Sequence, residues 1–261
     1  MSDSELHYEV KDSIGVLTLN RPHAFNALTF DMYDEIGEIT ANAPTDGSVK
    51  AIIITGSGDR AFAAGTDIGL FQDFKTPEQG IAYEKRFARC FEQLERCPVP
   101  TIAAIAGACT GGGAGIAAVC DLRIATQSIK FGFPIARTLG NCLSAAALSR
   151  LSAVLGEGRL VDILLNARLI EADEALAIGL VTSITPDHET LMRDAWSMAE
   201  RLTGHAPLTM QAVKEILRRM RNGAGAFAYD EDIIGGVYSS EDFREGVQAF
   251  LAKRKPNWQG R

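Results

Sequence analysis

The sequence predicts an α/β core followed by an all-helical C-terminal region. Up to about residue 185, short β-rich apolar runs alternate with segments whose apolar residues recur at helical spacing. Beyond that point only helical patterns follow, and alternation followed by helices is typical of an α/β unit with an appendage. The length of 261 residues suits this arrangement. We therefore expect a core over residues 1–200 and a helical region over residues 201–261.

The expected elements follow from periodicity and from the residues that end each run. Residues 7–11 and 14–19 alternate around two turn residues, which predicts a β-hairpin. Thr29 is expected to cap a helix that runs to about residue 43, and the small residues of 60–75 predict a loop. Further strands are expected at 49–58, 101–107, 121–126, 129–134 and 180–184. Further helices are expected at 78–97, 111–120, 143–155, 157–165, 172–178, 188–203, 207–221, 227–236 and 241–252.

Composition excludes several classes of function. The net charge is −7 and no polybasic tract occurs, so no general attraction for nucleic acid is expected. The longest apolar stretches are interrupted well short of the ~20 residues that a membrane helix needs. The five cysteines are odd in number and form no CxxC pair, which indicates reduced, buried thiols. Together with the polar, acidic N-terminus, this favours a cytoplasmic protein.

Two glycine-containing segments, each following a predicted strand, are the strongest candidates for chemistry. The first is AFAAGTDI (61–68), in which small residues let a ligand approach the main chain. The second is GACTGGGAG (107–115), which leads into a helix whose first N–H groups lack intrahelical partners. Two main-chain N–H groups that converge on one oxygen are what a developing oxyanion requires. The pair therefore predicts an oxyanion site.

Each segment also has a less specific interpretation. Residues 61–68 alone are compatible with an ordinary tight turn. GAGIAA (113–118) fits a variant of the dinucleotide-binding fingerprint. However, no acidic residue stands about 20 positions further on, where that fingerprint requires one. Close packing of a helix on a sheet would also explain the glycines.

The motifs then carry a resemblance that runs almost end to end, from about residue 8 to residue 258. The chain resembles the crotonase family, which includes enoyl-CoA hydratases and isomerases. The resemblance rests on GVLTLNRPHAFNAL (15–28), VKAIIITGSGDRAFAAGTDI (49–68), PVPTIAAIAGACTGGGAGIAAVCDLRIAT (98–126), KFGFP (130–134), EADEALAIGLV (171–181), PLTMQAVKE (207–215) and FLAKRKPNW (250–258).

The resemblance implies a crotonase-like spiral of ββα units, with C-terminal helices that build homotrimers or dimers of trimers. It implies an enzyme acting on an acyl-CoA thioester, with coenzyme A as part of the substrate and no permanently bound cofactor or metal. It places Thr66 and Gly112 at the two N–H positions that stabilise the enolate oxyanion. The resemblance also places six residues around the CoA moiety, namely Ala24, Phe25, Ala64, Gly65, Asp67 and Ile68.

One departure from the family pattern bears directly on the reaction. Hydratases of this family use two glutamates, one three residues after the second oxyanion glycine and one directly after the F-G-x-P motif. Here these positions hold Gly115 and Ile135, which cannot transfer a proton. We therefore expect little hydratase activity. The alternatives are another chemistry of the family, namely isomerisation, decarboxylation or thioester hydrolysis, and a non-catalytic protein that binds acyl-CoA.

The segment after F-G-x-P holds further candidates for the acyl pocket, namely Arg137, Asn141 and Cys142. Arg137 is suited to an anionic acyl group, although a surface ion pair is an equal use for it. Asn141 is also a helix-capping residue type, and Cys142 is also compatible with a buried structural thiol. Tyr83 and Glu84, on the helix expected at 78–97, are weaker candidates for acid–base groups.

Overall fold

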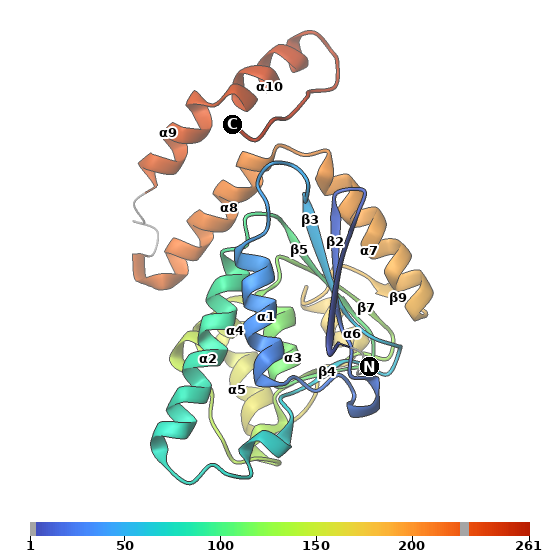
Figure 1. Ribbon diagram of the computed structural model, residues 1–261, viewed down its shortest axis with the longest axis vertical. Helices are drawn as coiled ribbons and strands as arrows, with labels where there is room; N and C mark the ends of the chain where they lie inside the picture. The colour runs from blue at the N-terminus through green and yellow to red at the C-terminus, as the bar shows by residue number, and fades with distance from the viewer. Residues whose placement is uncertain (1–3, 225–229) are drawn as a thin grey trace.

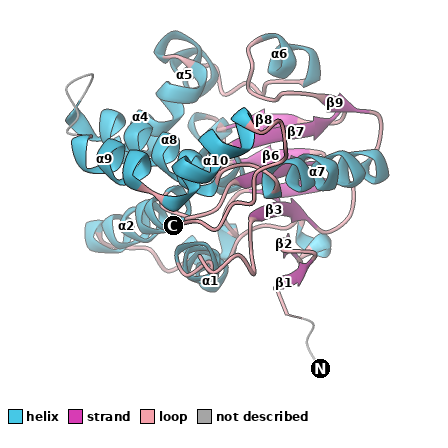
Figure 2. Ribbon diagram, turned by 90° about the horizontal axis from the view of Figure 1, so that it is seen from above, coloured by secondary structure: helices cyan, strands magenta, loops and turns pink. Residues whose placement is uncertain are grey.

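The computed structural model describes residues 4–224 and 230–261. Its main sheet has six strands in the order β1-β2-β3-β5-β7-β9 and is seen edge-on in Figure 2. Only β1 and β2 pair in antiparallel fashion, as the predicted hairpin, and every other pair in this sheet is parallel. The strands are β1 (Leu6–Lys11), β2 (Ile14–Leu19), β3 (Ala51–Gly56), β5 (Thr101–Ile105), β7 (Leu122–Thr126) and β9 (Ile184–Thr185).

A second, parallel sheet holds β4 (Ala61–Ala64), β6 (Ala108–Thr110) and β8 (Lys130–Gly132). The chain alternates between the two sheets, because a strand of the first sheet is followed by one of the second and then by a helix. This happens three times, in β3-β4-α2, β5-β6-α3 and β7-β8-α4. The repetition confirms the expected spiral of ββα units.

The helices pack on the sheets and then extend beyond them (Figure 1). Thr29 caps α1 as the sequence predicts, since its side chain accepts from the Met32 N–H, and the Ser144 side chain caps α4 by accepting from the Ala147 N–H. The helices are α1 (Phe30–Ala41), α2 (Pro77–Glu95), α3 (Gly112–Val119), α4 (Ala145–Leu155), α5 (Glu157–Leu165), α6 (Ala172–Ala177), α7 (His188–Thr203), α8 (Pro207–Arg219), α9 (Glu231–Ser239) and α10 (Glu241–Leu251).

The main sheet is buried on both faces, which explains its continuous apolar strands. Along β3, Ile52 and Ile54 belong to the larger core, which also contains residues of α1, α2 and α3. Ile53 faces the other way, into a smaller core closed by Leu191 and Ala195 of α7. Figure 1 shows α7 on one side of the sheet and α1 to α4 on the other. The helix that opens at Gly112 therefore lies entirely inside the larger core.

Three expectations about local structure were wrong or only partly right. Residues 60–75 are not all loop, because Ala61–Ala64 pairs with β6 as β4. This run is too short to show a strand period in sequence. The strand expected at 180–184 is displaced to Ile184–Thr185, since Leu180 and Val181 are buried outside any strand. The helix expected at 227–236 falls in part on residues 227–229, which lie outside the described residues, and within the described residues α9 begins at Glu231 and ends at Ser239.

The cysteines and apolar helices bear on the remaining compositional expectations. All five thiols are free, and four are buried as expected. Cys142 is exposed, so the buried-thiol interpretation was wrong there. Within residues 4–224 and 230–261, no helix combines the length and the apolar character needed to cross a bilayer. A cytoplasmic location stays a prediction.

Candidate active site

The two predicted glycine-containing segments meet at one edge of the second sheet. Strands β4 and β6 are parallel neighbours in which Ala64 pairs with Thr110, so the residues after each strand leave the same edge side by side. The approach is close, since a Cβ on Gly111 would stand 3.3 Å from the Gly65 Cα. Both glycines have positive φ, 93° at Gly65 and 50° at Gly111, which favours glycine at these turns.

The main-chain N–H groups of Thr66 and Gly112 are unpaired among the described residues. Leu28 pairs with the chain on either side of Thr66, because its N–H donates to the Gly65 carbonyl and its carbonyl accepts from the Asp67 N–H. The Thr66 N–H therefore points away from Leu28. Gly112 is the first residue of α3, and the first N–H groups of a helix have no intrahelical acceptor. Two free donors thus follow neighbouring strand ends.

Small residues are a steric requirement of this arrangement. A Cβ at Gly112 would lie 1.9 Å from the Tyr33 hydroxyl oxygen. A Cβ at Gly113 would lie 2.3 Å from the Ala63 carbonyl oxygen. Both distances are far below van der Waals contact, so the glycines let α3 pack directly against β4 and α1. Close helix packing and the unpaired N–H donors are therefore compatible, and they are not competing explanations here.

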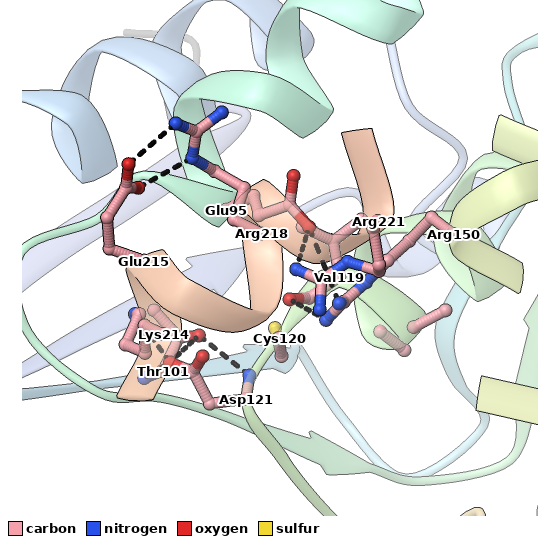
Figure 3. Close-up of polar contacts among 12 residues, drawn as sticks. Glu95, Thr101, Val119, Cys120, Asp121, Arg150, Lys214, Glu215, Arg218 and Arg221 are labelled. Atoms are coloured by element: carbon pink, nitrogen blue, oxygen red, sulfur yellow. Dashed lines mark hydrogen bonds and ion pairs between the residues drawn. The ribbon is translucent and has the colours of Figure 1, made fainter. Parts of the chain in front are cut away.

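The far end of α3 is held by two arginines. The Arg150 guanidinium donates to the Val119 carbonyl at 3.0 Å (Figure 3). The Arg123 guanidinium donates to the Cys120 carbonyl at 2.6 Å. These bonds satisfy carbonyls that a helix C-terminus leaves unpaired. Burial, with Arg221 nearby, lowers the pKa of Arg150 to about 10, so it stays charged at neutral pH. The eight-residue helix is thereby fixed at its C-terminal end, while its N-terminal end points at the strand edge.

A second anchor joins α8 to the same region. The Lys214 ammonium donates to the Asp121 carboxylate at 2.6 Å and to the Val99 carbonyl at 2.9 Å. The same carboxylate oxygen accepts from the Thr101 N–H and hydroxyl, as Figure 3 shows. Because Asp121 lies directly after the turn that ends α3, this ion pair couples α8 to the C-terminal end of α3 and to the start of β5.

The loop before α1 lies against the first donor segment. The Arg21 guanidinium bonds to the Asp67 carboxylate at 2.8 Å, and this pairing is the main cause of the lowered pKa of Asp67. The buried Asn26 amide donates to the Ala61 carbonyl at 2.7 Å. Phe25 adopts a left-handed conformation with φ of 51°, and the Arg60 guanidinium stacks over its ring at 4.0 Å. Asp67 therefore has a structural partner, which the sequence does not reveal.

The residues expected to border CoA are brought to one surface around that loop. The Ala64 N–H donates to the Phe25 carbonyl at 3.0 Å. This hydrogen bond joins the loop before α1 directly to β4. Phe25 and Ile68 are exposed, Ala24 and Asp67 are half-buried, and Gly65 is buried. The loop before α1 and the chain after β4 thus lie side by side next to Thr66.

The two positions of the family's glutamates are filled in different ways. Gly115 faces aromatic rings of α2, and a Cβ there would lie 2.2 Å from the Phe91 Cζ and 2.9 Å from the Phe87 Cζ. The two phenyl rings therefore occupy the space that a side chain at position 115 would need. This position lacks room for a side chain as well as a carboxylate. Ile135 lies in the short 3-10 turn Pro134–Ala136 and is half-buried. Neither position offers a proton-transfer group.

The structure does not join the remaining acyl-pocket candidates to the donors. Arg137, Asn141 and Cys142 are exposed on the segment between the 3-10 turn and α4. Their side chains make no hydrogen bond to any residue within 4–224 or 230–261. Ser144, next in that segment, is the N-cap of α4, and its N–H donates to the Glu84 carboxylate at 2.9 Å. Burial raises the pKa of Glu84.

Sequence reasoning missed Tyr33, whose hydroxyl lies beside Gly112. This side chain is fully buried on α1, and its oxygen is 2.8 Å from the Thr66 hydroxyl oxygen. The Thr66 hydroxyl is also 2.8 Å from the Tyr83 hydroxyl. In the sequence, Tyr33 is indistinguishable from other apolar-face positions of α1. Its hydroxyl acquires a partner only through contacts between α1 and the chain that follows β4.

The fold places the chain in the class of α/β proteins built as a spiral of ββα turns with C-terminal helices. Within that class, the family model described as "Enoyl-CoA hydratase/isomerase" matches residues 9–261, so the chain belongs to the enoyl-CoA hydratase/isomerase family. It is 35% identical to a crotonyl-CoA hydratase of Syntrophomonas wolfei, covering 99% of both chains. It is 34% identical to a short-chain-enoyl-CoA hydratase of Clostridium acetobutylicum, over 95% of this chain and 94% of the relative.

A solved structure agrees with the family assignment. An enoyl-CoA hydratase/carnithine racemase from Magnetospirillum magneticum superposes with a TM-score of 0.89 at 31% identity. The match covers 100% of this chain and 97% of that one. The whole chain, including its helical C-terminal region, therefore follows the crotonase fold.

Proposed function

We propose that this protein binds an acyl-CoA thioester and stabilises its enolate through the N–H groups of Thr66 and Gly112. The proposal is carried by one observation: these two donors are unpaired and follow neighbouring parallel strands whose ends lie in contact. A preorganised donor pair acts on charge that develops on the thioester oxygen. Family membership supports the same substrate class. Coenzyme A enters with the substrate, and no permanent cofactor is needed for this step.

The CoA moiety is assigned to the face formed by the loop before α1 and the chain after β4. The residues of this face are small or at least partly exposed, and they lie near Thr66 in the chain or in space. They are Ala24, Phe25, Ala64, Gly65, Asp67 and Ile68. The exposed Arg60–Phe25 stack adds a cation at this face, which suits the anionic phosphates of CoA. The Arg21–Asp67 pair holds the loop in place.

The reaction that we propose is an isomerisation or a lyase step, in which the oxyanion donors are the main catalytic element, and not efficient hydration. Hydration needs a group that activates water and one that protonates carbon, and each contributes roughly 10²–10⁴-fold. Gly115 is packed against Phe91, and Ile135 is apolar. Arg137, Asn141 and Cys142 stay proposed as groups around the acyl moiety.

A panel of CoA thioesters incubated in D2O and followed by mass spectrometry separates these reactions. Isomerisation introduces deuterium without a further change in composition, hydration adds the elements of D2O, decarboxylation removes CO2, and hydrolysis releases free CoA. We expect deuterium incorporation from a 3-enoyl-CoA and little hydration of crotonyl-CoA. Binding of the panel without any conversion would favour a non-catalytic acyl-CoA-binding protein.

The oxyanion donor is tested by replacing Gly112. Gly112→Pro removes the N–H, and Gly112→Ala retains it while adding the same Cβ. Because that Cβ would meet the Tyr33 hydroxyl, both variants are made in a Tyr33→Phe background. We expect the proline variant to lose roughly 10²–10³-fold in kcat relative to the alanine variant. Equal turnover of the two would show that the Gly112 N–H does not stabilise the transition state.

We also propose that residues 201–261 carry the interface with further copies of this chain, in a homotrimer or a dimer of trimers. Helices α9 and α10 project away from the sheets (Figure 1) and expose large apolar side chains. Phe250 is 84% exposed and Leu251 76% exposed, beside a 340 Å³ groove lined by Phe243, Val247 and Trp258. Apolar patches of this kind mark interaction sites. Phe250→Glu should shift the mass measured by light scattering toward the monomer, whereas an unchanged mass would exclude this face.

A further inference from the structure

Three hydroxyl groups form a chain that ends beside the proposed oxyanion site. Tyr33 comes from α1, Thr66 from the segment after β4, and Tyr83 from α2. The Thr66 oxygen lies 2.8 Å from each tyrosine oxygen. Thr66 thus contributes twice: its main-chain N–H is a proposed oxyanion donor, and its side chain joins the two phenols. The chain brings a proton-bearing group to a site from which both family carboxylates are missing.

The two phenols of this group differ in burial. Tyr33 is fully buried, and its hydroxyl lies 2.8 Å from the Thr66 hydroxyl and also has the Tyr83 hydroxyl as a hydrogen-bond partner. A buried hydroxyl that donates to nothing is costly, so Tyr33 donates its hydrogen within this group. Tyr83 is the phenol that is not fully buried, so it is the one that can serve a further acceptor.

The surroundings of Tyr83 suit a donor that keeps its proton until a strong acceptor appears. Its ring contacts Phe71 edge-on at 4.9 Å and stacks on Phe87 at 6.1 Å. Burial raises the pKa of Tyr83 above its ordinary value, so the phenol is protonated at neutral pH. The residue is nevertheless only half-buried. Tyr33, by contrast, has no exposed surface.

We propose that Tyr83 is the catalytic proton donor, delivering its phenolic hydrogen to carbon of the enolate held at Thr66 and Gly112. The inference rests on the proposed function, because it requires an enolate at that position. It assigns to α2 the role that α3 and the F-G-x-P turn have in the family's hydratases. Thr66 and Tyr33 are positioning residues that act through Tyr83.

The step balances within the named groups. The O–H bond of Tyr83 breaks as a C–H bond forms at the enolate, and the enolate electron pair restores the thioester carbonyl. The tyrosinate that remains accepts the hydrogen bond from the Thr66 hydroxyl, which Tyr33 supports in turn. The proton lost from the α-carbon when the enolate forms passes to solvent, and water returns one proton to Tyr83, so the overall number of protons is unchanged. No oxidant, metal or additional reactant is needed.

Tyr83→Phe is the direct test, because it removes one oxygen atom and keeps the aromatic packing. With a 3-enoyl-CoA in D2O as the probe, we expect deuterium incorporation into the product to slow by roughly 10²–10⁴-fold. The dissociation constant for butyryl-CoA, an unreactive probe, should stay within twofold. Tyr8→Phe is the matched control, since it removes the hydroxyl of another partly buried tyrosine, one with no described partner, and it should leave turnover unchanged.

Thr66 variants separate the hydroxyl chain from the oxyanion donors. Thr66→Val keeps the main-chain N–H and removes the hydroxyl, so we expect about a tenfold loss of turnover and recovery in Thr66→Ser. Wild-type turnover in Tyr83→Phe would overturn the inference, as would weaker butyryl-CoA binding that accounts for the whole loss. If the Gly112 proline variant loses activity while Tyr83→Phe does not, only this inference fails. If both retain full turnover, the proposed function fails as well.

Discussion

A carboxylate restored at position 115 should not by itself restore the hydratase reaction. Gly115→Glu places the family's residue on α3, where the new Cβ would lie 2.2 Å from the Phe91 Cζ and 2.9 Å from the Phe87 Cζ. Both rings belong to the buried core and contact each other in a tilted arrangement with their centroids 4.1 Å apart. α3 cannot retreat, since Gly113 is already packed against Ala63. The substitution therefore forces α2 and α3 apart or expels the new side chain.

The expected cost follows from two effects. Overpacking a well-filled core costs typically about 1–3 kcal/mol. Burying a polar group without a partner costs about 1–3 kcal/mol more by protein mutational data. We therefore expect Gly115→Glu to lower the free energy of unfolding by about 2–6 kcal/mol, a large part of the roughly 5–15 kcal/mol that holds most domains together. Gly115→Ala is the matched control and should show the packing cost alone.

Urea unfolding, monitored by circular dichroism, measures these differences, and a crotonyl-CoA assay at 263 nm measures any gain of hydration. Adding Phe91→Ala to Gly115→Glu removes the ring that blocks the site and should recover part of the lost stability. If Gly115→Glu alone unfolds at the wild-type urea concentration and hydrates crotonyl-CoA rapidly, position 115 is not closed by α2. Our account of this departure from the family would then be wrong.

Two further outcomes are expected from the network around the site. Lys214→Met should lower the free energy of unfolding by about 3 kcal/mol, because it leaves the partly buried Asp121 carboxylate without its cation. Adding Asp121→Asn should recover part of that loss in the same urea titration, and an unchanged midpoint for the single variant would contradict the anchor. Burial raises the folded-state pKa of Glu84, so the folded protein holds this proton more tightly than the unfolded chain. The protein should therefore lose stability as pH rises from about 4.3 through the folded pKa, and Glu84→Gln should remove that part of the pH dependence. If the free energy of unfolding depends on pH equally in Glu84→Gln and wild type, this contribution of Glu84 is refuted.

Much of the fold was predictable because its signals are local. The buried strands of the main sheet are continuous apolar runs, and the caps at Thr29 and Ser144 are determined by residue type and position. Strand β4 was not predictable, since its four residues, AFAA, are too few to show a period and become a strand only by pairing with β6. The second sheet as a whole consists of three- and four-residue strands, so its existence depends on the spiral and not on propensity.

Some features of the candidate site were likewise predictable from the sequence, and others were not. The sequence by itself predicted that the segments 61–68 and 107–115 come after strands at 49–58 and 101–107, and it determined that glutamate is absent at positions 115 and 135. Only the tertiary structure decided that the two turns touch, because strand order is a long-range property. It also decided that Phe91 fills the space at Gly115 and that Tyr33 and Tyr83 meet at Thr66. The physical reason is that a residue's type limits the chemistry it can do, whereas its partners are chosen by packing between segments far apart in the chain.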